Sequence, residues 1–138
     1  MATNTRNAIA DHVTGSIHNA DYMALTERYA PDALLDMNLP TWRFQLQGPD
    51  AIKQYFTEQT ATLPNLHCTQ LRELVTEDAI AVESECRFDG PDGEYLWRCI
   101  DIIRIVGDEI VEHTQYCTGC WSPGDVERQS VEAPMVRW

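Results

Sequence analysis

The sequence predicts an α+β domain in which about three helices, from the N-terminal and central parts of the chain, pack within a strongly curved sheet of mixed but mostly antiparallel strands. Before Pro64, apolar residues recur every three or four positions in separate stretches, which is the spacing of amphipathic helices. After Pro64, the apolar pattern has period two over four long runs joined by short turns. Strands this long must bend, and a bent sheet covered by helices encloses one cone-shaped pocket.

Helices are expected at three places before Pro64. The first has an apolar stripe with one residue in each turn: Ile9, Val13 and Ile17. A short second helix follows, with Asp21 as its expected cap, and Pro31 stops it. The third is expected to begin with Asp50 as its cap and to end at Pro64.

Six strands are expected from alternating or continuous apolar runs. Their ranges are 33–38, 42–47, 66–75, 79–88, 94–106 and 109–119. The last four are joined by short turns rich in Gly and Asp, which favour hairpins. Residues 121–138 show no clear period, and we expect an irregular extension that packs across the sheet.

Length and composition indicate a single domain over residues 1–138, with its core at about 5–120. Asp and Glu outnumber Lys and Arg by 22 to 10, a formal net charge of −12. A chain this acidic does not attract nucleic acid or anionic lipid, and no apolar run approaches the roughly 20 residues of a membrane span. The N-terminus lacks a basic segment followed by an apolar one, so we expect a soluble, cytoplasmic protein.

The five cysteines are odd in number, and most lie in apolar, strand-like runs, which favours small buried residues over a disulfide framework. Cys117-Thr118-Gly119-Cys120 has the spacing of a metal-binding or redox pair. A zinc site needs a second pair, but only His113 is near, and a redox pair normally opens a helix, whereas Pro123-Gly124 follows here. We therefore predict structural cysteines, no metal and no cofactor.

Three segments resemble junctions of one known superfamily. They are Tyr29-Ala30-Pro31-Asp32-Ala33, Gly48-Pro49-Asp50-Ala51-Ile52, and the hairpin of residues 100–105 and 107–113. Over about residues 5–120, the sequence is similar to nuclear-transport-factor-2-like domains, and the hairpin resembles their SnoaL-like branch, the polyketide cyclases and their relatives. The resemblance implies a cone-shaped α+β fold. It leaves the reaction open, because the superfamily includes ketosteroid isomerases, limonene-type epoxide hydrolases, scytalone-type dehydratases and non-catalytic binding domains.

Asp101 is the first candidate catalytic residue. Arg98 and Arg104 on its strand indicate that even positions face outward, so Asp101 points inward among apolar neighbours. The resemblance implies that Asp101 matches the protonated acid with which ketosteroid isomerases donate a hydrogen bond to the substrate oxygen. His113 and Gln115 share one face of the last strand and are expected to line the same cone. A purely structural role for this buried Asp and His is the alternative.

The roles expected of His113 and Gln115 differ. A His close to a buried carboxylate suits acid/base catalysis at neutral pH. Gln115 stands where related cyclases and epoxide hydrolases often carry an Asp, and its amide can hold a carbonyl or a water but cannot usefully exchange a proton.

Asp36 is a candidate general base. It lies within one residue of the position, held here by Met37, where ketosteroid isomerases carry their base, so a β-bulge would be needed. Asp36 and Asn38 can equally form a turn-stabilising pair at the end of a strand.

The charged segment 83–89 has two interpretations. Its charges fall on odd positions, which predicts a solvated sheet face. Limonene-type epoxide hydrolases, however, hold an Arg and carboxylates inside the cone on this strand. Arg87 with Glu85 or Asp89 matches that set, with Asn38 to hold the water.

We expect a cofactor-independent acid/base enzyme that isomerises, dehydrates or cyclises a hydrophobic, oxygenated small molecule of polyketide, terpenoid or steroid type. The alternatives are an epoxide hydrolase or epoxide-opening cyclase, and a non-catalytic binding or interaction domain. Further ligand contacts are expected from aromatic side chains and one His: Trp42, Tyr55, Tyr22, His67 and Trp97. An apolar band on the outer sheet face (Ile100, Ile102, Phe88) predicts a homodimer, because relatives of this shape commonly pair sheet to sheet.

Overall fold

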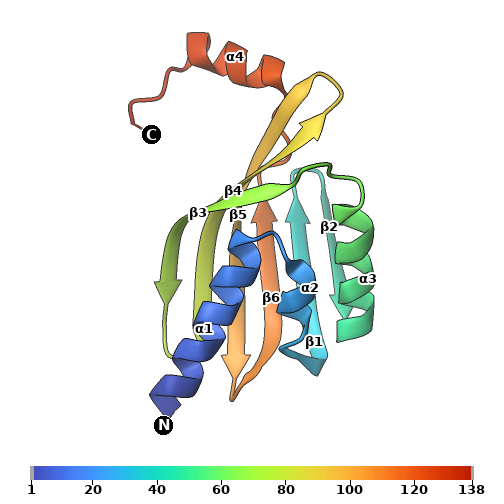
Figure 1. Ribbon diagram of the computed structural model, residues 1–138, viewed down its shortest axis with the longest axis vertical. Helices are drawn as coiled ribbons and strands as arrows, with labels where there is room; N and C mark the ends of the chain where they lie inside the picture. The colour runs from blue at the N-terminus through green and yellow to red at the C-terminus, as the bar shows by residue number, and fades with distance from the viewer. Residues whose placement is uncertain (1, 138) are drawn as a thin grey trace.

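In the computed structural model, a six-stranded sheet carries three helices on one side, and a fourth helix stands at one end (Figure 1). The structure describes residues 2–137, and side chains from residue 8 onward. The elements in chain order are α1 (Ala2–His18), α2 (Tyr22–Thr26), β1 (Tyr29–Leu39), β2 (Trp42–Gln47), α3 (Pro49–Thr60), β3 (His67–Val75), β4 (Ala79–Gly90), β5 (Gly93–Val106), β6 (Glu109–Cys117) and α4 (Pro123–Glu132). The predicted α+β class is confirmed.

The sheet has the strand order β2-β1-β6-β5-β4-β3. All neighbouring strands are antiparallel except β1 and β6, which run parallel. The parallel pair brings the first strand of the chain beside the last, so residues far apart in sequence meet at the centre of the sheet. The mixed sheet expected from the sequence is therefore present.

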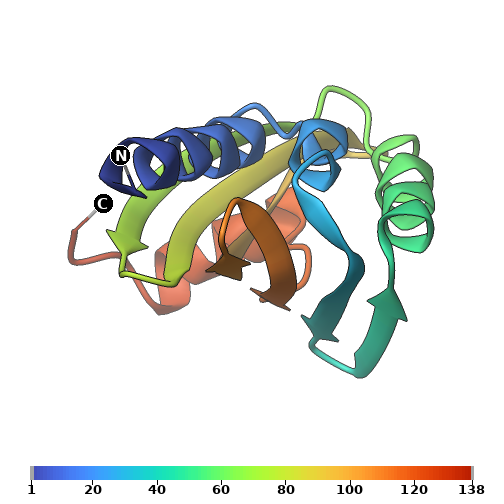
Figure 2. The ribbon, with the colours of Figure 1, turned by 90° about the horizontal axis from the view of Figure 1, so that it is seen from below.

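The helices α1, α2 and α3 lie on the same side of the sheet (Figure 2). The apolar stripe predicted for α1 is buried in the core: Ile9, Val13 and Ile17. Burial of one helical face against a sheet is what holds a short amphipathic helix in place. Within residues 2–137, no helix is both long and apolar enough to cross a membrane.

Alternation along the strands separates an inner face, toward the helices, from an outer face. On β5, Asp101 and Ile103 are fully buried, whereas Ile100 and Ile102 are each 41% exposed. The parity inferred from Arg98 and Arg104 therefore holds. On β4 the even positions are the inner ones, as the complete burial of Val82, Ser84 and Cys86 shows.

Two boundaries differ from the sequence-based expectation. The strand expected at 33–38 begins earlier, at Tyr29, because Tyr29 pairs with Ile110 of β6, and an irregular register between Tyr29 and Leu34 accommodates Pro31. Helix α3 begins at Pro49 after Gly48, which has φ 91° and caps through no side chain. Its start depends on a backbone conformation that suits glycine, so Asp50 lies in the first turn and is not the cap.

The C-terminal segment is not irregular, because residues 123–132 form helix α4. The Ser122 side chain accepts a hydrogen bond from the Asp125 backbone N–H, and the Asp125 carboxylate accepts one from the Ser122 N–H. This capping box, with Pro123 in the first turn, is a recognisable sequence signal for a helix start. The helix buries no residue and stands beyond the β4–β5 hairpin instead of packing across the sheet (Figure 1).

The expectation of no disulfide was wrong. Cys68 and Cys86 lie directly opposite each other on β3 and β4 and are joined by a disulfide. The sequence could not reveal this pairing, because it depends on the register of two strands whose cysteines are 18 residues apart. Three cysteines are free: Cys99, Cys117 and Cys120.

Candidate active site

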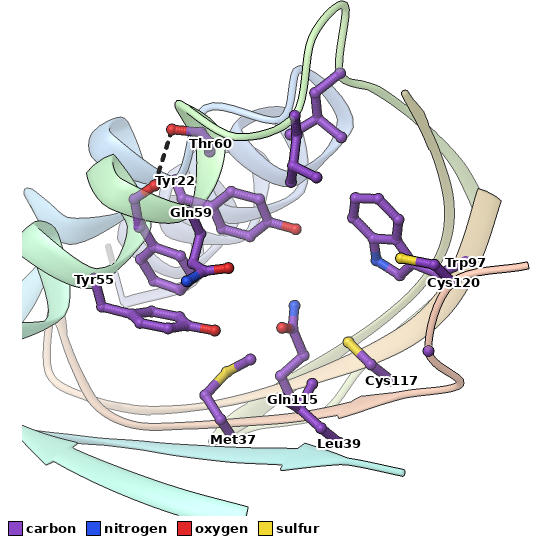
Figure 3. A pocket seen from close by; sticks show the side chains of 14 residues that line it. Tyr22, Met37, Leu39, Tyr55, Gln59, Thr60, Trp97, Gln115, Cys117 and Cys120 are labelled. Atoms are coloured by element: carbon purple, nitrogen blue, oxygen red, sulfur yellow. Dashed lines mark hydrogen bonds between the residues drawn. The ribbon is translucent and has the colours of Figure 1, made fainter. Parts of the chain in front are cut away.

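A cavity of approximately 180 Å³ lies between the helices and the inner face of the sheet, toward the end of β6 (Figure 3). Most of its wall is apolar. Its side chains come from α2, α3, the strands β1, β5 and β6, and the loops that follow α3 and β6: Tyr22, Met37, Leu39, Tyr55, Phe56, Gln59, Thr60, Leu63, Leu66, Trp97, Gln115, Cys117 and Cys120. A mainly apolar hollow with a few polar groups is the usual form of a small-molecule site.

A few polar groups point into this cavity. The hydroxyls of Tyr22 and Tyr55 and the amides of Gln59 and Gln115 face its centre, and the thiols of Cys117 and Cys120 lie near Trp97 (Figure 3). These groups are all neutral donors or acceptors, and among the side chains that the structure describes no Asp, Glu, His, Lys or Arg lines the wall. The cavity is therefore suited to a neutral or weakly polar ligand that carries an oxygen.

Directly behind Gln115 lies a buried chain of hydrogen bonds. The Gln115 Nε2 donates to Asp101 Oδ1 over 2.8 Å, and His113 Nε2 lies 2.6 Å from the same oxygen. On the other side of the imidazole, His113 Nδ1 is 2.5 Å from the hydroxyl of Tyr29. Both Asp101 and His113 are completely buried. The register explains the cluster, since Asp101 is opposite Gln115 across β5 and β6.

The contacts of Asp101 suit a carboxylate. Its Oδ1 accepts N–H groups from His113 and Gln115, and the Cys99 Sγ, 3.8 Å from Oδ2, is a third, weak donor. If the neutral imidazole of His113 donates its Nε2 proton to Asp101, its Nδ1 is free to accept the proton of the Tyr29 hydroxyl. The His113 tautomer with its proton on Nε2 is thus compatible with every hydrogen bond from Tyr29 through His113 to Asp101.

The buried tyrosines are held as donors. Burial, and then the charge of Asp101, raise the pKa of Tyr22 well above its ordinary value, while a hydrogen bond with Gln115 opposes the change. Burial and Asp101 likewise raise the pKa of Tyr29 well above its usual range, and burial raises that of Tyr55. All three hydroxyls therefore keep their protons at neutral pH and can donate them in hydrogen bonds.

The sequence-predicted residues divide between the two faces of the sheet. Those that line the cavity are Gln115, Tyr22, Tyr55 and Trp97. Asp101 and His113 lie on the inner face, one side chain behind the wall. The others lie elsewhere: Asp36, Asn38, Trp42, His67, Glu85 and Arg87.

Asp36 and Asn38 lie on the outer face, because Met37 between them is the inward residue and lines the cavity. The Asp36 carboxylate accepts two bonds from Arg43, at 3.0 Å to Nε and 2.6 Å to NH2. Gln45 donates to it over 3.2 Å, and Asn38 Nδ2 does so at 3.2 Å. The bond to Arg43 is the main cause of a lowered pKa of Asp36. Asp36 is thus tied into a salt bridge away from the cavity.

Asp36→Asn is expected to lower stability at neutral pH and to leave the cavity intact. The pKa of Asp36 is lower in the folded than in the unfolded state. Its carboxylate therefore adds to the free energy of unfolding above the ordinary Asp pKa of about 3.9, and this stabilisation is lost as pH falls through the folded-state pKa. Urea unfolding should therefore show a difference in the free energy of unfolding between wild type and Asp36→Asn that is constant near neutral pH and disappears in acid. The exposed Asp32, replaced by Asn, serves as the control; a gap that widens in acid would contradict the assignment.

Glu85 and Arg87 also lie on the outer face, since Ser84 and Cys86 on the same strand are buried inside. Arg87 bridges Glu85 and Glu94 at 2.9 Å and 2.8 Å. Burial alone would raise the pKa of Glu85, but hydrogen bonds from Arg87 and Arg98 lower it overall. The solvated-face interpretation of this strand is thus the one the structure supports.

The remaining candidates lie outside the cavity or on a different face from the one expected. Trp42 is 67% exposed, and the exposed His67 lies 4.0 Å from Glu94 in the outer-face charge cluster. Phe88 shares the inward parity of Cys86 and packs against Trp97, with ring centroids 5.7 Å apart. Phe88 is therefore not part of the outer apolar band expected from the sequence.

Sequence reasoning missed several residues of the site. Tyr29 was assigned to the apolar side of the second helix and to a junction motif, whereas it begins β1 and contacts His113 through the parallel β1–β6 pairing. Gln59 follows Tyr55 by one helical turn and was expected on the same side of this helix, but no ligand contact was assigned to it. Cys117 shares the inward parity of Gln115, which was a usable signal. Among residues 2–137, no three His, Cys, Asp or Glu side chains are placed to hold a metal ion.

The fold agrees with what comparisons with known proteins show. The family model of the SnoaL-like domain matches residues 9–113, which is more than half of the chain. The chain therefore belongs to the SnoaL-like domain family. Among curated proteins, none matches the sequence significantly.

Solved structures share the fold at low sequence identity. A nuclear-transport-factor-2-like protein of unknown function from Cytophaga hutchinsonii matches with TM-score 0.65 and 21% identity, over 83% of this chain and 96% of that one. A similar protein from Mesorhizobium loti has TM-score 0.65 and 21% identity, over 86% and 95%. A protein with a ketosteroid isomerase-like fold from Catenulispora acidiphila, in complex with trimethylamine, has TM-score 0.64 and 18% identity, over 88% and 91%. At these identities the likeness shows the fold alone.

Proposed function

We propose that the chain is a cofactor-independent acid/base enzyme that isomerises, dehydrates or cyclises a hydrophobic small molecule carrying a ketone or similar oxygen. One observation carries the proposal. The Gln115 amide lies in the cavity wall and is hydrogen-bonded at 2.8 Å to a buried Asp101–His113 pair. A charged acid/base pair that is shielded from water behind an apolar cavity is typical of sites for proton transfer.

In this mechanism the substrate oxygen binds among the neutral donors of the cavity. Tyr22 donates its hydroxyl proton in a hydrogen bond, and the raised pKa keeps that proton available. The Nε2 of Gln115 has two hydrogens: one is bonded to Asp101 over 2.8 Å, and the other makes only a weak contact with Cys99 Sγ at 3.9 Å, which a substrate oxygen can replace. Donors held in fixed positions stabilise the negative charge that develops on the oxygen as a neighbouring carbon loses its proton.

In this mechanism Asp101 takes up the carbon-bound proton on Oδ2, the carboxylate oxygen that Gln115 and His113 leave free. His113 Nε2, 2.6 Å from Asp101, and Tyr29 behind it stabilise the carboxylate before the transfer. The proton returns from Asp101 to another carbon in an isomerisation, or to a departing hydroxyl in a dehydration. Each reaction then starts and ends with the same protonation state of the pair.

The epoxide-opening alternative has less support. It needs Arg87, a carboxylate and Asn38 in the cavity, but these residues lie on the outer face of the sheet. Arg87 is already engaged by Glu85 and Glu94 there.

The test is turnover of a panel of cyclic enones, β-hydroxy ketones and epoxides by wild type, Asp101→Asn, His113→Gln and Arg87→Ala. We expect loss of ketone turnover by about 10²–10⁴-fold in the first two variants, as for removal of an acid/base group, and wild-type rates in Arg87→Ala. Epoxide turnover that requires Arg87 and survives Asp101→Asn would support the alternative. Binding without turnover across the panel would indicate a binding domain.

We also propose that the outer sheet face forms a homodimer. Its centre is apolar, with Ile100 and Ile102 each 41% and Tyr116 53% exposed. The surrounding ion pairs, among them Arg98 with Glu85, offer both signs of charge to a second copy turned by a two-fold axis. Light scattering of Ile100→Glu should show monomers where wild type shows dimers. The control is Val131→Glu, at an exposed site on α4, and equal masses for wild type and Ile100→Glu would contradict the interface.

A further inference from the structure

Four of the five cysteines lie on the inner side of neighbouring strands and form one oblique band, because Cys99 pairs with Ser84, two residues from Cys86. Cys68 on β3 faces Cys86 on β4, and these two form the disulfide. Next in the band, Cys99 on β5 faces Cys117 on β6, and the thiol of Cys120 lies close by in the cavity wall. A second cross-strand cysteine pair, unoxidised, therefore stands beside the first.

The backbone brings Cys99 and Cys117 within disulfide range. The Thr118 N–H donates to the Arg98 carbonyl over 3.0 Å, so residues 98 and 118 form a hydrogen-bonded pair. The neighbouring pair, Cys99 and Cys117, is then of the non-hydrogen-bonded kind, with Cα atoms about 4.5 Å apart and side chains close together. That separation lies within the range that disulfides span. The Cys117 thiol is also the largest cause of a raised pKa of Cys99, as expected of two neighbouring thiols.

The two thiols differ in access. Cys117 lines the cavity and is only partly buried, whereas Cys99 is 3% exposed. Cys99 is held by its neighbours, with Ser84 Oγ 3.3 Å and Asp101 Oδ2 3.8 Å from its sulfur. A small oxidant that enters the cavity reaches Cys117 and the exposed Cys120 before the buried Cys99, and Cys99 is the sulfur that lies opposite Cys117 across the two strands.

We propose that Cys99 and Cys117 are an oxidative modification site, which a peroxide-class oxidant converts into a second cross-strand disulfide. The peroxide transfers one oxygen to the Cys117 sulfur, which becomes a sulfenic acid, and one water is released. The Cys99 sulfur then attacks the Cys117 sulfur, the S–S bond forms, and hydroxide leaves. Asp101 accepts the Cys99 proton and passes it to the hydroxide as a second water. In total, two thiols are oxidised and one peroxide is reduced to two waters.

The modification changes the candidate active site. An oxidised Cys99 has no S–H to offer, so Asp101 loses the weak donor on its Oδ2. The Cys117 sulfur is drawn toward β5 and away from the cavity. The proposal itself stands on the strand register and does not depend on the proposed reaction.

The test is peptide mapping of the full-length protein after treatment with hydrogen peroxide and alkylation of the remaining thiols. Trypsin cuts after Arg98, Arg104 and Arg128, so Cys99 lies in the peptide 99–104, and Cys117 and Cys120 share the peptide 105–128. We expect a cross-linked pair of these two peptides, with Cys120 alkylated. The peptides 54–72 and 73–87, linked through Cys68 and Cys86, are the internal reference.

Two variants complete the test. In Cys120→Ser, a change at an exposed position, the 99–104 peptide should still be cross-linked to 105–128. In Cys117→Ser that cross-link should be absent. The proposal is overturned if peroxide instead gives a single 105–128 peptide lighter by two hydrogen atoms, which means a Cys117–Cys120 bond. It is equally overturned if Cys117 ends as a sulfinic acid, or if Cys99 and Cys117 both remain alkylatable.

Discussion

Tyr22→Phe is expected to lower kcat/KM for ketone substrates by about 10²–10³-fold, the usual cost of removing one donor from a site that stabilises an oxyanion. The hydroxyl of Tyr22 faces the cavity, and its raised pKa shows that burial and the charge of Asp101 hold it as a donor. The ring stacks on Phe56 with centroids 4.6 Å apart, and phenylalanine keeps that contact. The loss should therefore appear in turnover and leave the thermal midpoint nearly unchanged.

The matched control for this prediction is Tyr116→Phe. Tyr116 is 53% exposed and adjacent to Cys117 on β6, so its side chain lies on the outer face, away from the cavity. Removing its hydroxyl should leave kcat/KM unchanged. Equal rates for wild type and Tyr22→Phe, with the same product, would show that the Tyr22 hydroxyl does not assist the reaction.

His113→Phe is expected to destabilise the protein by about 3–5 kcal/mol, because it leaves the Asp101 carboxylate buried without its main partner. Only Gln115 and the weak Cys99 donor would remain for that charge. Phenylalanine keeps the ring volume, so the loss does not arise from a cavity. Urea unfolding at neutral pH measures it, and the exposed His67, replaced by Phe, should change stability by no more than about 0.5 kcal/mol.

The double variant His113→Phe/Asp101→Leu tests whether the loss is due to the pair. Asp101→Leu removes the buried charge that His113→Phe leaves without a partner. The double variant should therefore lose less stability than the sum of the two single variants, by about 2–3 kcal/mol. Recovery is partial, since the buried Tyr29 hydroxyl also loses its partner. Additive losses would mean that His113 and Asp101 contribute independently.

Most elements of the fold could be predicted from the sequence, because each depends on residues that are close together in the chain. The spacing of Ile9, Val13 and Ile17 predicted the buried side of α1, and the two charged arginines of β5 fixed which way Asp101 points. The exception was α4, whose capping signal at Ser122 and Asp125 is short. Elements that depend on a few neighbouring residues can be recognised from one chain.

The site was harder to predict because it depends on pairing between strands. Asp36 is one residue from an inward position, and without knowledge of the β1–β6 register its side chain could be assigned to either face. Its partner Arg43 lies on β2, so the salt bridge could not be predicted without knowing how the two strands pair. The same applies to Tyr29, which is 84 residues away from His113.

The central claim is that a substrate oxygen is polarised in the cavity by Tyr22 and Gln115 in front of Asp101. Infrared spectroscopy of a bound cyclic enone with a ¹³C-labelled carbonyl measures this directly. The carbonyl stretch should shift to lower frequency on binding to wild type, and most of that shift should vanish in Tyr22→Phe while calorimetry still shows binding. A bound enone whose carbonyl frequency is the same in wild type, in Tyr22→Phe and in an apolar solvent would contradict the claim.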